Sequence, residues 1–179
     1  RLLRSRFTVS VEIDPPRGIQ TQKVMAGARL MAERGVDCIN IADSPMARIR
    51  MSAMALAYQL HRELPAMELI LHYTTRDRNL MALQSELLGA HALGLRNILC
   101  LTGDPPSLGD YPNMTAVYDT DSVGLIKIVR KLNEGSDQAG ASIGGRTAFA
   151  VGCGVNPTSE NLKVELERFH RKIEAGVQY

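Results

Sequence analysis

The 179 residues are enough for one domain with a hydrophobic core and too few for two. Lys and Arg number 21 and Asp and Glu number 19, so the formal net charge of +2 excludes the strongly basic surface of a typical nucleic-acid-binding protein. Trp is absent, and no apolar run approaches the roughly 18 residues that a membrane-spanning helix needs, so neither a nucleic acid nor a membrane is expected as a partner.

Short apolar segments alternate with longer amphipathic ones along the chain. The short segments predict strands over residues 7–11, 36–42, 67–72, 97–101 and 147–151. Apolar residues at helical spacing predict helices over residues 24–31, 49–60, 80–90, 121–132 and 162–173. Ser44 is the expected N-cap of the second helix, with Pro45 at its first position.

The predicted strands recur at a fixed interval. The first four are centred on Val9, Ile39, Leu69 and Leu99, which lie 30 residues apart, the length of one βα unit. Repeated βα units predict an α/β fold with a parallel sheet, in which helices cover the strands. The next interval is longer, and its excess lies mainly in residues 102–120, directly after the fourth strand.

Two architectures are compatible with this period. One is an open five-stranded sheet, and the other is the first five βα units of a (β/α)8 TIM barrel. Residues 176–179 look like the start of a sixth strand, which favours the barrel. Since the chain begins with Arg1, we expect residues 1–179 to be a partial barrel domain, truncated at both ends.

The cysteines give no sign of a disulfide framework or a zinc site. Cys38, Cys100 and Cys153 are odd in number, far apart and not part of a CxxC pair. A reducing, cytoplasmic compartment is therefore expected, and no signal-peptide pattern opens the sequence.

Polar residues follow the predicted strands where a parallel sheet would bring them to one face. They include Glu12, Asp14, Asp43, Ser44, His72, Thr74, Thr75, Arg76, Thr102, Gly103, Asp104, Gly152, Cys153 and Asn156. In parallel α/β folds the loops after the strands carry the chemistry, so a shared pocket is expected at this face.

The residue types at this face exclude one chemistry and leave two alternatives open. No lysine lies at a strand end, so a Schiff-base aldolase has no nucleophile here. A metal-dependent lyase or hydrolase remains an alternative, in which Glu12, His72 and Asp104 hold a divalent ion. An inactive interaction domain of the same fold is the second alternative.

Three motifs resemble those of the methylenetetrahydrofolate reductase family, in the same order. They are Val9-Ser-Val-Glu-Ile-Asp-Pro-Pro-Arg-Gly18, His72-Tyr-Thr-Thr-Arg-Asp-Arg-Asn79 and Leu101-Thr-Gly-Asp-Pro-Pro106. Residues 84–94 and 109–112 are similar to one branch, in which the reductase is fused behind a homocysteine methyltransferase domain.

The resemblance implies a (β/α)8 barrel that contains FAD. The implied reaction is the reduction of 5,10-methylenetetrahydrofolate to 5-methyltetrahydrofolate, with NAD(P)H as the source of reducing equivalents. The implied partners are therefore the folate and NAD(P)H, with a fused methyltransferase domain and a homo-oligomer as further possibilities.

The resemblance also implies roles for individual residues. Glu12 matches the general acid that protonates the folate, and we expect it to be partly buried. Asp104 matches an aspartate that contacts both folate and flavin, and no metal ligand is implied. The implied flavin-binding residues are His72, Thr102, Gly103, Asp104, Tyr118, Asp119, Gly152, Asn156, Glu165, Arg168, Arg171 and Lys172.

Overall fold

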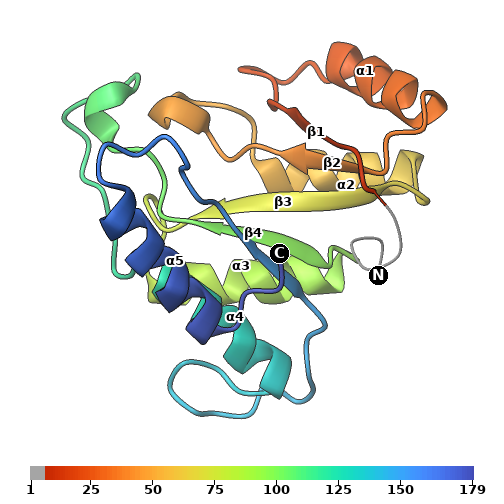
Figure 1. The fold of residues 1–179 in the computed structure, drawn as a ribbon. Coiled ribbons are helices and arrows are strands. Elements are labelled where there is room, and N and C mark those ends of the chain that lie inside the picture. Colours follow the sequence, from red (N-terminus) through yellow and green to blue (C-terminus); the bar gives the residue numbers. More distant parts are fainter. Residues whose placement is uncertain (1–6) are drawn as a thin grey trace.

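The computed structural model describes residues 7–179, which form alternating strands and helices (Figure 1). The strands are β1 (Ser10–Ile13), β2 (Cys38–Ile41), β3 (Glu68–Thr74), β4 (Asn97–Leu101) and β5 (Ala150–Cys153). The α-helices are α1 (Gln22–Glu33), α2 (Ala53–Glu63), α3 (Leu80–Ala92), α4 (Ser122–Glu134) and α5 (Leu162–Ala175). Two short 3₁₀ helices are η2 (Pro45–Ala47) and η3 (Pro106–Leu108).

The described strands form one parallel sheet whose order follows the chain, β1-β2-β3-β4-β5. A doubly wound open sheet would reverse its strand order at a switch point, and this sheet does not. The arrangement is that of the first five βα units of a (β/α)8 barrel, so the predicted fold class is confirmed.

Side chains alternate between the two faces of the sheet, as the strand pleat requires. The face toward the helices carries buried apolar side chains such as Ile39, Leu71 and Ile98, which pack in one core with helix residues such as Leu56 and Leu125. Burial of this apolar surface is the main force that holds the helices on the sheet. None of the helices in residues 7–179 is long and apolar enough to cross a membrane.

The opposite face of the sheet borders a cavity of about 340 Å³. It is lined by Thr8, Ser10, Cys38, Asn40, Glu68, Ile70, Asn97, Leu99, Ala150 and Tyr179. Residues 176–179 return along β5, where the Gln178 amide donates to the Val151 carbonyl at 2.7 Å and the Cys153 amide to the Tyr179 carbonyl at 3.0 Å (Figure 1). This segment therefore lies where the expected sixth strand of a barrel would run.

The first predicted strand begins later than its apolar pattern suggested. β1 starts at Ser10, and the side chain of Phe7 is 90% exposed. The alternation of Phe7, Val9 and Val11 predicted the strand type correctly, but the parallel ladder with β2 extends only over residues 10–13.

The predicted start of the second helix is wrong. Ser44 has a left-handed backbone (φ 46°) and its side chain caps nothing, while Ile49 lies outside the helix and is 54% exposed. Only the short 3₁₀ helix η2 forms here, because the Met46 and Ile49 amides donate to the carboxylates of Asp104 and Asp110 instead of continuing a helix. Helix α2 begins at Ala53, eight residues later than predicted, and has Ser52 as its N-cap.

This correction predicts different effects for two serine substitutions. Ser52 Oγ accepts a hydrogen bond from the Ala55 amide, so we expect Ser52→Ala to lower the free energy of unfolding by about 1 kcal/mol. Ser44→Ala removes no cap and should change it by less than about 0.5 kcal/mol. Denaturant unfolding of the full-length protein measures both values, and the reverse ranking would contradict the assignment of Ser52 as the cap.

Candidate functional site

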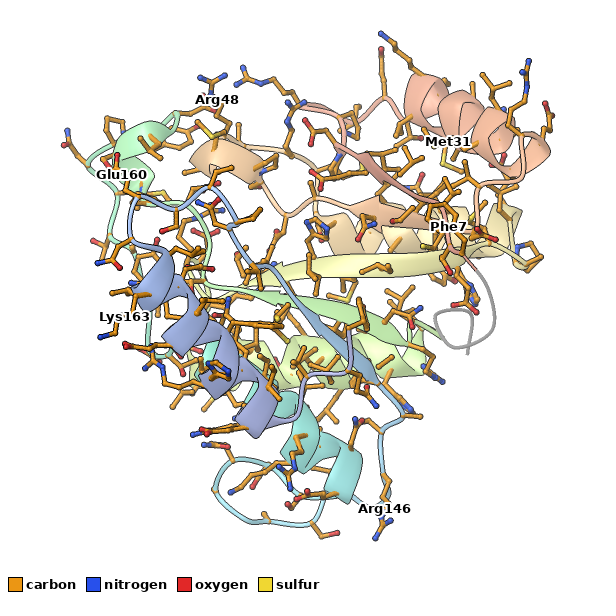
Figure 2. The ribbon with its side chains drawn as sticks, viewed as in Figure 1. Phe7, Met31, Arg48, Arg146, Glu160 and Lys163 are labelled. Atoms are coloured by element: carbon orange, nitrogen blue, oxygen red, sulfur yellow. The ribbon has the colours of Figure 1, made fainter. Side chains whose placement is uncertain are left out.

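A second cavity, of about 190 Å³, lies at the carboxyl ends of β1 to β4. It is lined by Glu12, Ala42, Asp43, Pro45, His72, Thr74, Arg76, Leu101, Thr102, Gly103 and Asp104. In Figure 2 the labelled Arg48 and Glu160 mark this end of the molecule, and Phe7 marks the opposite end. The structure thus brings Glu12 and Asp104 to one cavity, together with His72, Thr102 and Gly103.

Glu12 faces a buried imidazole across the cavity. Its Oε2 atom lies 4.0 Å from Nε2 of His72, whose side chain is 9% exposed. Burial lowers the pKa of His72, and the negative charges of Glu12 and Asp43 oppose this only in part. His72 is therefore neutral near pH 7. The Glu12 side chain is 59% exposed, so the partial burial expected for this carboxyl is not seen within residues 7–179.

Asp104 is held in place from several sides. Its Oδ2 atom accepts a hydrogen bond from the Met46 amide at 2.7 Å, which ties it to the loop after β2. The Tyr118 hydroxyl donates to the carbonyls of Gly103 and Asp104 at 3.4 and 3.3 Å. The Arg76 guanidinium, which is almost fully buried, donates to the Ser44 carbonyl on the same loop at 3.2 Å. These contacts fix the carboxylate at the cavity rim before any ligand is bound.

Gly103 allows β4 to turn into its loop at the cavity wall. Its φ of +93° lies in the left-handed region that favours glycine. A Cβ atom at this position would lie 3.1 Å from the Cβ atoms of both Thr74 and Arg76. The glycine is therefore required both by the backbone conformation and by the packing of β3 against this turn.

We expect Gly103→Ala to lower the free energy of unfolding by about 2 kcal/mol, because it combines a strained φ with a tight contact. Gly27→Ala is the matched control, since Gly27 lies inside α1 with an ordinary φ and a Cβ atom there would meet no packed neighbour within 4 Å. That substitution should raise stability by about 0.5–1 kcal/mol. Thermal or denaturant unfolding of the full-length protein measures the stability of both variants. Equal effects of the two substitutions would show that the turn does not require glycine at position 103.

A charge network lies beside the cavity, with Asp43 and Arg78 largely buried and Glu86 at the surface. Arg78 Nη1 donates to Asp43 Oδ2 at 2.7 Å and its Nε donates to Glu86 Oε2 at 2.8 Å. The guanidinium also lies over the ring of Tyr73, 4.4 Å from the centroid. Asp43 Oδ2 accepts two further hydrogen bonds, from the amide and the hydroxyl of Thr74, both at 3.0 Å. This network joins the ends of β2 and β3 to helix α3.

Sequence reasoning identified Asp43 as an acid at a strand end but missed its partners. Arg78 lies in a loop, Glu86 in a helix and Tyr73 on the outward face of β3, so their convergence depends on tertiary structure. The charged run Arg76-Asp77-Arg78 was the available signal, because arginines directly after a buried strand need partners.

The remaining predicted site residues lie outside this cavity lining. On α5, the Glu165 carboxylate accepts a hydrogen bond from the backbone amide of Asn156 at 3.0 Å and lies 3.9 Å from the Arg168 guanidinium. On the same helix, Lys172 Nζ donates to the Gly154 carbonyl at 2.6 Å. Arg171 is exposed on the same helix. The α5 group therefore gathers around the β5–α5 loop.

Two predicted positions have structural contacts of their own. Asp119 accepts a hydrogen bond from the Leu80 amide at 3.0 Å, which stabilises the start of α3. Gly152 lies under Tyr179, because a Cβ atom there would be 2.3 Å from the tyrosine ring. Within residues 7–179 no cluster of three or more His, Cys, Asp or Glu side chains is arranged to hold a metal ion.

A parallel sheet in barrel order, with a cavity that acidic, hydroxyl and imidazole side chains help to line at the carboxyl ends of its strands, is typical of β/α-barrel enzymes. A family model described as methylenetetrahydrofolate reductase matches residues 1–179, and the chain belongs to this family. A comparison with curated proteins gave no match. Family membership assigns the chain to oxidoreductases of one-carbon metabolism and makes a folate its substrate class.

Proposed function

We propose that the protein reduces 5,10-methylenetetrahydrofolate to 5-methyltetrahydrofolate, using bound FAD and reducing equivalents from NAD(P)H. The observation that carries this proposal is the placement of Glu12 and Asp104 at one cavity. A proton donor and a fixed negative charge beside the same substrate are what this reduction needs.

The residues at the cavity suit a flavin. Ala42, Pro45 and Leu101 offer apolar surface for a flat ring, and His72 and Thr102 offer polar groups for its edge. Near the β5–α5 loop, Lys172 and the exposed Arg171 supply positive charge for a pyrophosphate. When bound there, FAD would accept hydride from the nicotinamide and donate it to the folate.

The role proposed for Glu12 follows from the chemistry of the substrate. The bridging methylene group must open to an iminium cation before it can accept a hydride, and opening requires a proton on the departing nitrogen. Glu12 lines the cavity and more than half of its side chain is exposed, so a bound folate can reach the carboxyl. The proton moves from the Glu12 carboxyl to that nitrogen.

The role proposed for Asp104 is electrostatic. Its carboxylate is already oriented by the Met46 amide, so no reorganisation is needed when positive charge develops on the substrate. A negative charge near the iminium cation lowers the energy of that cation relative to the closed, neutral ring.

The proposal also covers the domain, the compartment and the further FAD contacts of the protein. Residues 1–179 would belong to one barrel domain of a cytoplasmic enzyme, and Tyr118, Asp119, Gly152, Asn156, Glu165 and Arg168 would complete the FAD site. The motifs at residues 84–94 and 109–112 support a fused methyltransferase domain. The mass of a single native chain shows whether a methyltransferase domain is fused to the reductase. The mass of the folded protein in solution shows whether it forms a homo-oligomer.

The test is a half-reaction with the purified full-length protein. We expect visible flavin absorbance that is bleached by NAD(P)H under anaerobic conditions and restored by methylenetetrahydrofolate with formation of 5-methyltetrahydrofolate. Reoxidation no faster than in buffer would overturn the proposal and favour an inactive domain. A colourless protein that binds a divalent metal would favour the metal-dependent lyase or hydrolase instead.

A further inference from the structure

An amide side chain lies between Glu12 and His72 on the inner face of the sheet. Asn40 in β2 is the register partner of Glu12 in β1 and of Ile70 in β3. His72 follows Ile70 by two residues, so its side chain projects from the same face of β3. Asn40 is therefore a neighbour of both side chains, although it lies inside an apolar strand and belongs to none of the motifs described above.

The hydrogen bonds of Asn40 determine which ring nitrogen of His72 carries a proton. The Asn40 Nδ2 group donates to the hydroxyl of Ser10, which turns Oδ1 toward the imidazole. Oδ1 lies 3.3 Å from Nε2 of His72. A side-chain amide oxygen can only accept a hydrogen bond, so Nε2 must be the donor. In a neutral imidazole this places the single N–H group on Nε2 and leaves Nδ1 without a proton.

This arrangement affects Glu12, because the same Nε2 atom lies 4.0 Å from its carboxylate. The charged groups that face His72 are Glu12 from β1 and Asp43 after β2, whereas its register partner on β4 is the apolar Leu99. With its N–H directed to the neutral amide of Asn40, the ring does not need to pair with Glu12. An imidazolium paired with Glu12 would instead hold that carboxyl in its ionised form.

We propose that Asn40 is a positioning residue, which holds His72 as the neutral Nε2–H tautomer and so leaves the Glu12 carboxyl free to exchange its proton with the substrate. The part that concerns Glu12 rests on the proposed function. The tautomer of His72 does not, and it is measured separately.

The tautomer is measured by ¹⁵N NMR of the full-length protein labelled at histidine. The His72 signals are identified by their loss in His72→Gln, and the ring nitrogen shifts report which nitrogen is protonated. We expect the Nε2–H tautomer in the wild type and in Asn97→Leu, and a mixture of tautomers in Asn40→Leu. Asn97 is the matched control because it is the other register partner of Ile70 and makes its own bonds to Glu68 and Leu69.

A wild-type His72 protonated on Nδ1 would overturn the inference, and so would equal spectra for Asn40→Leu and Asn97→Leu. Asn40→Asp keeps an acceptor oxygen, so it should retain protonation at Nε2 and keep the ring protonated to higher pH than in the wild type. This third variant tests the same hydrogen bond if the leucine variant fails to fold.

The catalytic part is tested by the rate at which methylenetetrahydrofolate reoxidises the prereduced protein. We expect Asn40→Leu to lower this rate about tenfold and to shift its pH profile, and Asn97→Leu to change neither. An unchanged rate and profile in Asn40→Leu would overturn the positioning role. A wild-type protein that does not reduce the folate would contradict the proposed function. The NMR measurement does not depend on that reaction, so it would still support or overturn the assignment of the His72 tautomer.

Discussion

Replacing Glu12 by Gln should leave the flavin absorbance of the full-length protein intact and lower the rate of folate reduction by about 10²–10⁴-fold. Glutamine keeps the size and the hydrogen-bonding capacity of the side chain but cannot donate a proton to the departing nitrogen. Because the Glu12 side chain is 59% exposed at the cavity, the substitution should cost little stability. Anaerobic stopped-flow absorbance measures flavin reduction by NAD(P)H and flavin reoxidation by the folate separately. In Glu12→Gln the first rate should stay near that of the wild type, and only the second should fall.

Glu68→Gln is the matched control for this experiment. Glu68 also projects from the inner face of the sheet, but it borders the cavity at the amino end of β3 and accepts a hydrogen bond from Asn97. We expect this variant to reduce the folate at a rate close to that of the wild type. Loss of flavin from Glu12→Gln, or equal rates for the two variants, would show that Glu12 is not the acid.

Replacing Arg78 by Met should lower the free energy of unfolding by roughly 3–5 kcal/mol, which is the largest effect on stability that we expect. The Asp43 and Arg78 side chains are only 8% and 16% exposed, and the substitution leaves the Asp43 carboxylate buried without its cation. Burial opposes the charge on Arg78, but its charge interactions and hydrogen bonds with Asp43 and Glu86 together outweigh burial and raise the pKa of the guanidinium, so Arg78 is charged in the folded protein. Denaturant unfolding of the full-length protein measures the loss.

Two further variants show whether the buried charge causes this loss. Arg130 pairs with Glu134 on the surface of α4, where the two side chains are 59% and 58% exposed, so Arg130→Met should cost less than about 0.5 kcal/mol. Combining Arg78→Met with Asp43→Asn removes both charges and should recover part of the stability lost in Arg78→Met. If Arg78→Met lies within about 1 kcal/mol of the wild type, the pair does not hold the strand ends together.

The order of the elements could be predicted from the sequence because local pattern determines it. Apolar runs at 30-residue spacing identified the strands, and the bounds of β4 agree residue for residue with the prediction of 97–101. The loop after β2 could not be predicted in this way. Ser44 followed by Pro45 is a good local start for a helix, but amide hydrogen bonds to Asp104 and Asp110 hold the segment in another conformation. Those partners are about 60 residues distant in the sequence.

The candidate site was predictable to the extent that it depends on strand ends. A parallel sheet brings the carboxyl ends of its strands together, so Glu12, His72 and Asp104 could be grouped from the strand pattern alone. Asn40 could not be found, because a single amide within an apolar strand gives no signal until the register with Glu12 is known. Arg78 and Glu86 were missed for a related reason, since their contact depends on how α3 packs against the sheet.

The folate is proposed to react in the cavity at the carboxyl ends of β1 to β4. A crystal structure of the full-length protein with bound 5-methyltetrahydrofolate shows where the pterin ring binds. We expect this ring to lie in the cavity, within hydrogen-bond distance of the Glu12 and Asp104 carboxylates. A pterin bound elsewhere, with both carboxylates facing only solvent, would contradict it.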